Sequence, residues 1–268
     1  MDFKGKVAIV TGSALGIGRG IAVALAEQGA DIDGFDILVK ENEDLAKEIE
    51  ALGRKALAIE CDVSDKEQVR SSVNKVYETF GRIDILINNA GVFNFTYAFN
   101  SDYDETIELF DKCMAVNARG TYLCSLAVVP IMLKQGSGSI INVITNHVKR
   151  DKYRPGVLEQ GYDASKWAQL SLTDTLAIEL KPRGILVNAI CPAATDTPML
   201  RSYLDVAGNY GCRTSLPSMM TVEDVGMAVI NILNWGPDGP VGQAPLVTSR
   251  EDCENLKFYQ GEGRTILS

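Results

Sequence analysis

The chain has 268 residues, of which 46% are apolar, and it carries a formal net charge of −9. A chain of this size can bury one large core, so a single domain over residues 1–268 is expected. The negative charge disfavours nucleic acid and anionic membranes as partners. No apolar run approaches the length of a membrane span, and residues 1–6 lack the apolar core of a secretory signal. A cytoplasmic protein is therefore expected.

Short apolar stretches alternate with helical patterns along the chain. Strands are expected near residues 7–11, 31–36, 55–60, 83–88, 138–145, 184–190 and 244–248. Most of these stretches are short and largely apolar, as in a parallel sheet that is covered on both faces, although residues 31–36 include Asp31, Asp33 and Asp36. The order predicts an α/β fold, a doubly wound (Rossmann-type) parallel sheet with helices on both faces. Ligands of such sheets bind at the carboxyl ends of the strands.

A glycine-rich turn follows the first expected strand. It contains Gly12, Gly16 and Gly18 and leads directly into a helical pattern. Glycines allow the tight turn and a close approach of the backbone to a pyrophosphate, while the helix N-terminus attracts its negative charge. This segment predicts a dinucleotide site, although the glycine spacing differs from the commoner G-x-G-x-x-G. The alternative is a glycine-rich turn without a ligand.

The second expected strand ends at Asp36, about 20 residues beyond the glycines, where an acidic side chain can bind both ribose hydroxyls. A carboxylate there repels the 2′-phosphate of NADP. No Arg or Lys occurs between Thr11 and Ile17, or at Ile37 and Leu38, to neutralise such a phosphate. The sequence therefore predicts NAD as the cofactor.

Tyr162 and Lys166 lie four positions apart and share one face of an expected helix. An unperturbed phenol has a pKa of about 10. The ammonium of Lys166 lowers that pKa by stabilising the phenolate, so the pair can transfer a proton near neutral pH. The spacing alone also occurs by chance in helices.

Further motifs follow in order: Asp62-Val63, Asn88-Asn89-Ala90-Gly91, Asn117, and Pro192 followed by Thr197. Together with the glycine turn, Asp36 and the Tyr162/Lys166 pair, they resemble the short-chain dehydrogenase/reductase family from about Lys4 to about Val247. The resemblance implies an NAD-dependent oxidoreductase that interconverts a secondary alcohol and a ketone, with Tyr162 as acid and base. It also implies a small-molecule substrate and a homotetramer.

The resemblance also implies individual roles. Lys166 would bind the nicotinamide ribose, Asn117 would hold a water that relays the proton, and Thr145 would orient the substrate oxygen in place of the family's serine. The residues expected to bind the cofactor are Thr11, Gly12, Ser13, Gly16, Ile17, Gly18, Asp36, Asp62, Val63, Asn89, Ala90, Gly91, Tyr162, Lys166, Pro192, Thr195 and Thr197. For Asp62, a helix cap is the structural alternative.

The sequence departs from the family pattern at three places. Thr145 carries an extra methyl group, which restricts its χ1 angle. Ala193 stands where glycine usually follows Pro192, and the C-terminal pattern is replaced by Val247-Thr248-Ser249-Arg250. These departures leave a second hypothesis open, a catalytically impaired NAD-binding sensor or scaffold. A nucleotide-sugar epimerase or dehydratase would need a larger substrate domain.

The substrate is not decided by the sequence. Segment 146–161 carries His147, expected at the pocket rim, and a cluster of cations that would suit an anionic hydroxy acid or would simply be solvated: Lys149, Arg150, Lys152 and Arg154. The aromatic residues Phe93, Phe95, Tyr97 and Phe99 would suit a cyclic or steroid-like alcohol, or would belong to the core. Segment 194–220 is expected to form a substrate lid. Segment 251–268 is expected to pack on a neighbouring subunit or to cover a pocket.

The six cysteines have no C-x-x-C spacing, and they are Cys61, Cys113, Cys124, Cys191, Cys212 and Cys253. They are expected to be reduced thiols. The sequence shows no metal-ligand spacing, so no metal is expected.

Overall fold

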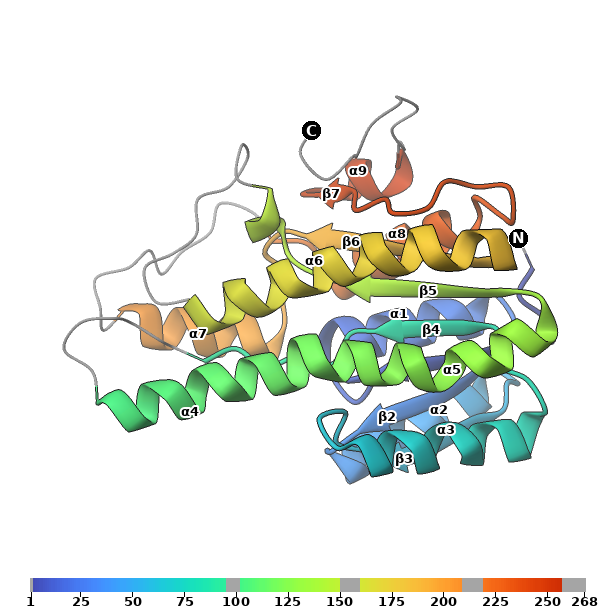
Figure 1. Cartoon of the computed structure of the whole chain (residues 1–268), viewed down its shortest axis with the longest axis horizontal. Helices are drawn as coiled ribbons and strands as arrows, with labels where there is room; N and C mark the ends of the chain where they lie inside the picture. Colours follow the sequence, from blue (N-terminus) through green and yellow to red (C-terminus); the bar gives the residue numbers. More distant parts are fainter. Residues whose placement is uncertain (1, 95–101, 150–159, 209–218, 257–268) are drawn as a thin grey trace.

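The computed structural model describes residues 2–94, 102–149, 160–208 and 219–256. Seven parallel strands form one sheet in the order β3-β2-β1-β4-β5-β6-β7 (Figure 1), which confirms the expected α/β fold. The strands are β1 (Val7–Thr11), β2 (Asp31–Asp36), β3 (Ala56–Glu60), β4 (Ile85–Asn88), β5 (Gly138–Val143), β6 (Ile185–Pro192) and β7 (Leu246–Val247). All seven expected strands are present. The fifth ends two residues earlier than expected, although the N–H of Ile144 still donates to the carbonyl of Ile190 in β6 at 2.9 Å.

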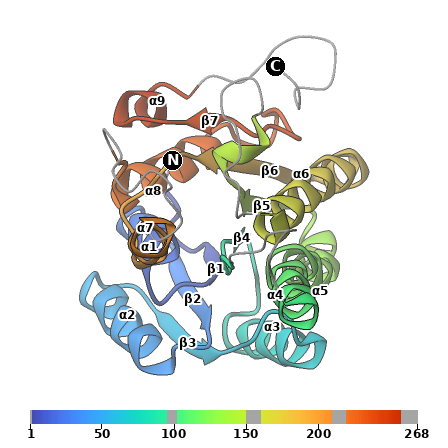
Figure 2. The same ribbon diagram turned by 90° about the vertical axis from the view of Figure 1, so that its left-hand side faces the viewer.

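Helices cover both faces of the sheet (Figure 2). On one face lie α1 (Gly16–Glu27), α2 (Val39–Ala51) and α8 (Val222–Leu233), and on the other lie α3 (Lys66–Phe80), α4 (Tyr103–Cys113), α5 (Thr121–Gln135) and α6 (Gln160–Leu180). Shorter elements are η1 (Met114–Gly120), η2 (Asn146–Val148), η3 (Lys181–Arg183), α7 (Pro198–Gly208) and α9 (Arg250–Glu254).

A hydrophobic core lies on each face of the sheet, and alternate side chains of a central strand pack into one core or the other. In β1, Ala8 and Val10 pack with α1 and α8, whereas Val7 and Ile9 pack with α3, α5 and α6. Successive side chains of a strand point to opposite faces, so a strand covered on both faces buries nearly all its side chains and favours apolar residues. This preference explains the apolar stretch of β1, whereas β2 departs from it at Asp31, Asp33 and Asp36.

Helices α4, η1 and α5 run on from one another over residues Tyr103–Gln135. By length and composition alone, this helix could span a membrane, which corrects the expectation that no segment approaches that length. In the fold, the α5 side chains Cys124, Val128 and Met132 are buried beneath the sheet. Packing against the sheet therefore accounts for part of the apolar character of this helix, while Tyr122, Leu126 and Leu133 are exposed.

The start of the expected C-terminal tail packs within its own subunit. Cys253 of α9 is fully buried, and its backbone carbonyl accepts a hydrogen bond from Asn231 of α8 at 2.7 Å. Residues 257–268 of the tail lie outside the described residues, as does Cys212. The other five cysteines are buried free thiols.

Candidate active site

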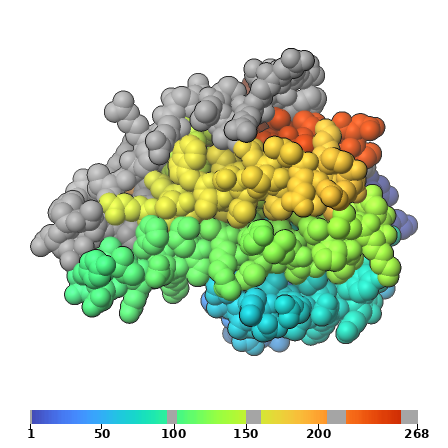
Figure 3. Space-filling model, viewed as in Figure 1, coloured from blue at the N-terminus to red at the C-terminus, as the bar shows by residue number. Residues whose placement is uncertain are grey.

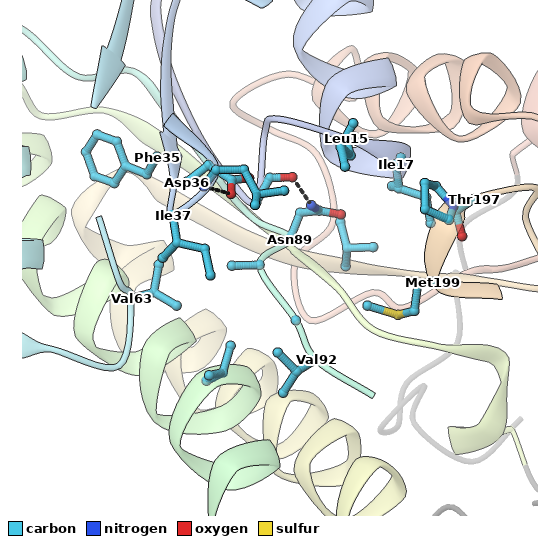
Figure 4. A pocket seen from close by; sticks show the side chains of 18 of the residues that line it. Leu15, Ile17, Phe35, Asp36, Ile37, Val63, Asn89, Val92, Thr197 and Met199 are labelled. Carbon is cyan, nitrogen blue, oxygen red and sulfur yellow. Dashed lines mark hydrogen bonds between the residues drawn. The ribbon is translucent and has the colours of Figure 1, made fainter. Parts of the chain in front are cut away.

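A cavity of about 560 Å³ opens at the carboxyl ends of β1 to β5, between these ends and helices α6 and α7. Ligand sites in doubly wound sheets lie at this edge. The cavity brings together many of the residues singled out from the sequence, namely Gly12, Gly16, Ile17, Asp36, Asp62, Val63, Asn89, Ala90, Gly91, Tyr162, Lys166 and Thr197. Figure 4 shows Asp36 near Phe35 and Val63 at one end, with Thr197 and Met199 at the other.

The glycine turn is constrained by close backbone contacts. Gly12 has a φ of +62°, and a Cβ atom added there would lie 2.8 Å from Cα of Ala90. A Cβ atom on Gly18 would lie 2.0 Å from the carbonyl oxygen of Gly12. Helix α1 begins after Leu15 with no side-chain cap and no acidic residue in its first turn. Such a helix N-terminus fits a negatively charged diphosphate group.

The carboxylate of Asp36 is fixed at the end of β2. Its two oxygens accept hydrogen bonds from the backbone N–H groups of Ala14 and Leu38, each at 2.9 Å. A carboxylate can accept further hydrogen bonds from two ribose hydroxyls. The guanidinium of Arg19, in the first turn of α1, is paired with Glu48 and does not line the cavity.

Asp62 lines the cavity and also forms a turn. Its Oδ1 accepts hydrogen bonds from the N–H and the hydroxyl of Ser64 at 2.8 and 2.7 Å. The N-cap of α3 is Asp65, whose carboxylate accepts from Glu67 and Gln68. The helix cap is therefore Asp65 and not Asp62, so the alternative role considered for Asp62 is wrong. The Asp62 carboxylate instead stabilises the turn that precedes the cap.

Asn89 and Thr11 join the ends of β4 and β1. The amide of Asn89 donates to the carbonyl oxygens of Thr11 and Gly12 at 3.0 Å, and the hydroxyl oxygen of Thr11 accepts from the N–H groups of Asn89 and Ala90 at 3.0 Å. Asn89 and Ala90 line the cavity, while Thr11 lies behind it. These bonds hold the glycine turn against the β4 loop.

Lys166 and Tyr162 project from α6 toward the cavity. The ammonium of Lys166 lies 5.6 Å from the centre of the Tyr162 ring and donates a hydrogen bond to the carbonyl of Val143 at 3.0 Å. Burial lowers the pKa of Lys166 to about 8. The group therefore still carries its charge through most of the neutral range, where it favours a phenolate nearby.

Asn117 sits in the π-helical turn η1 and is fully buried. Its amide accepts from the N–H of Val92 at 2.8 Å and donates to the Val92 carbonyl and the Ser165 hydroxyl at 3.0 and 2.9 Å. The Ser165 hydroxyl donates in turn to the Tyr162 carbonyl at 2.6 Å. The side chain of Asn117 thus ties the β4 loop to the first turn of α6, a link that its sequence motif did not reveal.

Thr145 follows β5 and is buried, with an extended φ of −167°. Its hydroxyl donates to the side-chain oxygen of Asn146 at 3.3 Å and accepts from the N–H of His147 at 3.4 Å. The neighbouring Ile144 lines the cavity, but Thr145 does not. Both bonds are long, so the hydroxyl can exchange them for a better partner.

Several residues expected at the cofactor lie behind the cavity. Besides Thr11, these are Ser13, Gly18, Pro192 and Thr195. Ser13 is buried and donates to Asn42 at 2.8 Å, and the hydroxyl of Thr195 donates to the carbonyl of Ala193 at 3.0 Å. These two hydrogen bonds stabilise the turns in which Ser13 and Thr195 lie.

The other lining residues are ten that sequence reasoning did not assign to the site, namely Leu15, Phe35, Ile37, Leu38, Cys61, Val92, Lys112, Val116, Val143 and Ile144, and two from the expected lid, Pro198 and Met199. Most are immediate neighbours of motif residues, and that adjacency was the available signal. Val116 directly precedes Asn117, whereas Lys112 of α4 had no such signal.

A second depression of about 290 Å³ shares Val92, Lys112 and Met199 with the cavity. Phe93 borders it, with its ring centre 5.0 Å from that of Tyr162 and 5.1 Å from that of Tyr203 in α7. The expected aromatic residues Phe95, Tyr97 and Phe99 lie outside the described residues.

The cationic cluster is only partly described. Burial raises the pKa of the Cys191 thiol to about 11, and the nearby charge of Lys149 opposes part of that rise. Lys149 is itself buried. Arg150, Lys152 and Arg154 lie outside the described residues. Segment 194–220 contributes Thr197, Pro198 and Met199 to the cavity, while Met220 is buried in the core.

Residues 6–206 match the family model described as short chain dehydrogenase. A 3-oxoacyl-[acyl-carrier-protein] reductase of Thermotoga maritima is 36% identical over 199 residues, which cover 74% of this chain and 78% of that protein. An uncharacterized NAD-dependent oxidoreductase of Mycobacterium tuberculosis is 40% identical over 212 residues, 74% of each chain. A short-chain type dehydrogenase/reductase from Mycobacterium marinum has a crystal structure that superposes with a TM-score of 0.82 at 28% identity, over 92% of this chain and 95% of its own. The chain therefore belongs to the short-chain dehydrogenase/reductase family of oxidoreductases.

Proposed function

We propose that the protein interconverts a secondary alcohol and a ketone by hydride transfer to or from NAD. The observation that carries the proposal is one cavity lined by the glycine turn, the Asp36 carboxylate and the Tyr162/Lys166 pair. The first two features suit a dinucleotide, and the pair supplies the acid and base.

The residues of the chain handle the proton. In oxidation the phenol oxygen of Tyr162 accepts the hydroxyl proton of the alcohol, and in reduction it donates a proton to the carbonyl oxygen. Lys166 stabilises the phenolate by its charge and is positioned to bind ribose hydroxyls. Thr145 orients the substrate oxygen, and Asn117 supports the relay of the proton to solvent. When bound, NAD supplies the hydride acceptor for oxidation and, as NADH, the donor for reduction.

NAD is favoured over NADP by the charge around Asp36. The fixed carboxylate accepts ribose hydroxyls but repels a phosphate in the same place. The neighbouring Leu15, Ile37 and Leu38 are apolar, and Arg19 is engaged by Glu48. The relative from Mycobacterium tuberculosis is also described as NAD-dependent.

A cyclic, largely apolar substrate fits the described surroundings of Tyr162 best. Phe93 contacts both Tyr162 and Tyr203, and Tyr203 and Met199 line the adjoining depression. Aromatic walls favour flat apolar rings over small polyols. Lys112, the lysine that lines both cavities, is the described group that an anionic hydroxy acid would use instead.

The impaired sensor remains the second candidate, because Thr145 replaces the family's serine and makes only long hydrogen bonds. The hydrogen bonds from Asn117 through Ser165 to Tyr162 favour the enzyme instead. These bonds fix the backbone of Tyr162, which a protein that only binds cofactor has no need to do.

The test is NADH formation from NAD⁺ with a panel of cyclic alcohols, hydroxysteroids, polyols and anionic hydroxy acids. Tyr162→Phe is the chemical control, and NADPH formation is measured beside it. Turnover with a cyclic alcohol that disappears in Tyr162→Phe is the expected result. NADH binding without turnover across the whole panel would favour the sensor.

We further propose that the protein is a homotetramer. Large apolar side chains are exposed on α5 and α6, namely Tyr122, Leu126, Leu133 and Ile178. These helices form the face seen in Figure 3. On α6, Leu170 and Leu176 are buried within the subunit and do not contribute to this surface. Light scattering of Ile178→Lys, which should weaken assembly, tests the proposal.

A further inference from the structure

We propose that His147 and Asp163 form a positioning pair that fixes the Thr145 turn against the first turn of the helix carrying Tyr162. The inference deepens the proposed function and rests on it, since positioning has a kinetic consequence only if Tyr162 and Thr145 act on a substrate.

The pair is short and sheltered. Nδ1 of His147 lies 2.7 Å from Oδ1 of Asp163, and their side chains are 13% and 14% exposed. At this distance a hydrogen bond from Nδ1–H to the Asp163 carboxylate holds the plane of the imidazole. The ring of His147 meets that of Tyr162 edge-on, with 5.8 Å between centres and 77° between planes.

The two ends of the pair belong to the two segments that must be aligned. Thr145 is the N-cap of η2 and lies two residues before His147, so movement of His147 displaces the backbone that carries the Thr145 hydroxyl. Asp163 directly follows Tyr162 and lies in the first turn of α6, which begins at Gln160. A hydrogen bond between His147 and Asp163 therefore acts on the spacing between the Thr145 hydroxyl and the Tyr162 phenol.

The first turn of a helix opens more readily than its middle. Deeper in the helix, Lys166 is anchored to the Val143 carbonyl, and Leu170 packs with Val148. At the first turn, Ser165 holds the backbone of Tyr162 from the η1 side. The pair supplies an anchor from the β5 side, where the substrate oxygen would be bound.

The experiment is a double-mutant cycle of His147→Leu and Asp163→Ala, measured as kcat and KM with NAD⁺ and the best alcohol of the panel. Each single variant is expected to lower kcat about 10-fold, the equivalent of one hydrogen bond. The double variant should lose no more than either single one, because both remove the same contact. The KM for NAD⁺ should change less than about 2-fold, since neither residue lines the cofactor cavity.

His147→Asn is the rescue variant, because its amide N–H can take the place of Nδ1–H without any proton transfer. It should recover most of the kcat that His147→Leu loses. Glu179→Ala, which removes an exposed carboxylate from the same helix, is the matched control and should behave as the wild type. If His147→Leu does not fold, the kcat values of Asp163→Asn and His147→Asn test the pair in its place.

The proposed pair would be refuted by a wild-type kcat in His147→Leu or by an effect confined to KM. It would also be refuted if the double variant lost the product of the two single-variant factors in kcat. Absence of turnover in the wild type would instead overturn the proposed function. In that case amide hydrogen exchange of residues 160–166 in the NADH complex still tests the pair. Faster exchange in His147→Leu but not in His147→Asn supports it, and equal exchange refutes it.

Discussion

Asp33 lies in the middle of β2, paired in register with Ile9 and Leu57 on the two neighbouring strands. It is fully buried, and among the described residues neither carboxylate oxygen has a hydrogen-bond partner. Burial, assisted by the nearby charge of Asp31, raises the pKa of Asp33 from 3.8 to about 8. The folded protein therefore holds a neutral carboxylic acid in a position where the unfolded chain is ionised.

The sign of the pH dependence follows from the two pKa values. The unfolded chain releases this proton near pH 3.8, while the folded protein keeps it until about pH 8. The free energy of unfolding should therefore fall as the pH rises from about 4 to about 8, and level off above that. Between pH 5.5 and 7.5 the fall attributable to Asp33 is about 2.5 kcal/mol, a large share of a typical stability of about 5–15 kcal/mol.

Asp33→Val replaces the carboxyl with an apolar group of similar size. Urea unfolding at pH 5.5 and 7.5, at one protein concentration, should show a gain in stability that is larger at pH 7.5 by about 2.5 kcal/mol. Lys166 does not interfere, because its folded pKa of about 8 and its unfolded pKa of 10.5 confine its effect to higher pH. The variant should keep the cofactor affinity of the wild type, since Asp33 does not line the cavity. Parallel pH profiles for wild type and variant would refute the reasoning.

Three further predictions concern the cavity and the C-terminus. Asp36→Ala should raise the KM for NAD⁺ about 10-fold or more, because it removes a charged hydrogen-bond acceptor for the ribose hydroxyls. It should also reduce the preference for NAD⁺ over NADP⁺, measured as the ratio of the two kcat/KM values, because it removes a charge that repels the 2′-phosphate. An unchanged ratio would contradict this role of Asp36. Gly18→Ala should abolish NADH binding or folding, followed by fluorescence and circular dichroism, because its Cβ would clash with the Gly12 carbonyl at 2.0 Å. Deletion after Arg250 should lower the melting temperature by several degrees, since it removes the buried Cys253, whereas deletion after residue 256 should leave that core contact intact. Equal melting temperatures for the two deletions would show that α9 adds no stability.

Much of the fold could be predicted from the sequence, because the relevant constraints are local. A strand covered on both faces favours apolar residues along most of its length, and a backbone with a φ of +62° beside another chain segment favours glycine, as at Gly12. The Tyr162/Lys166 spacing likewise follows from the helix repeat. Strand positions, the edge of the sheet where the cavity lies and the shared helical face of Tyr162 and Lys166 could therefore all be inferred from the sequence.

Only the tertiary structure decided which side chains of these motifs reach the cavity and which act behind it. Ser13 and Thr195 belong to motif segments, yet their hydroxyls bond within the protein. The contacts of Asn117 with Val92 and of His147 with Asp163 join residues 25 and 16 positions apart, which no local pattern encodes. Such contacts depend on how strands, turns and helices pack together, so the sequence determined the chemistry available to this protein, and the packing of distant segments decided where each group is held.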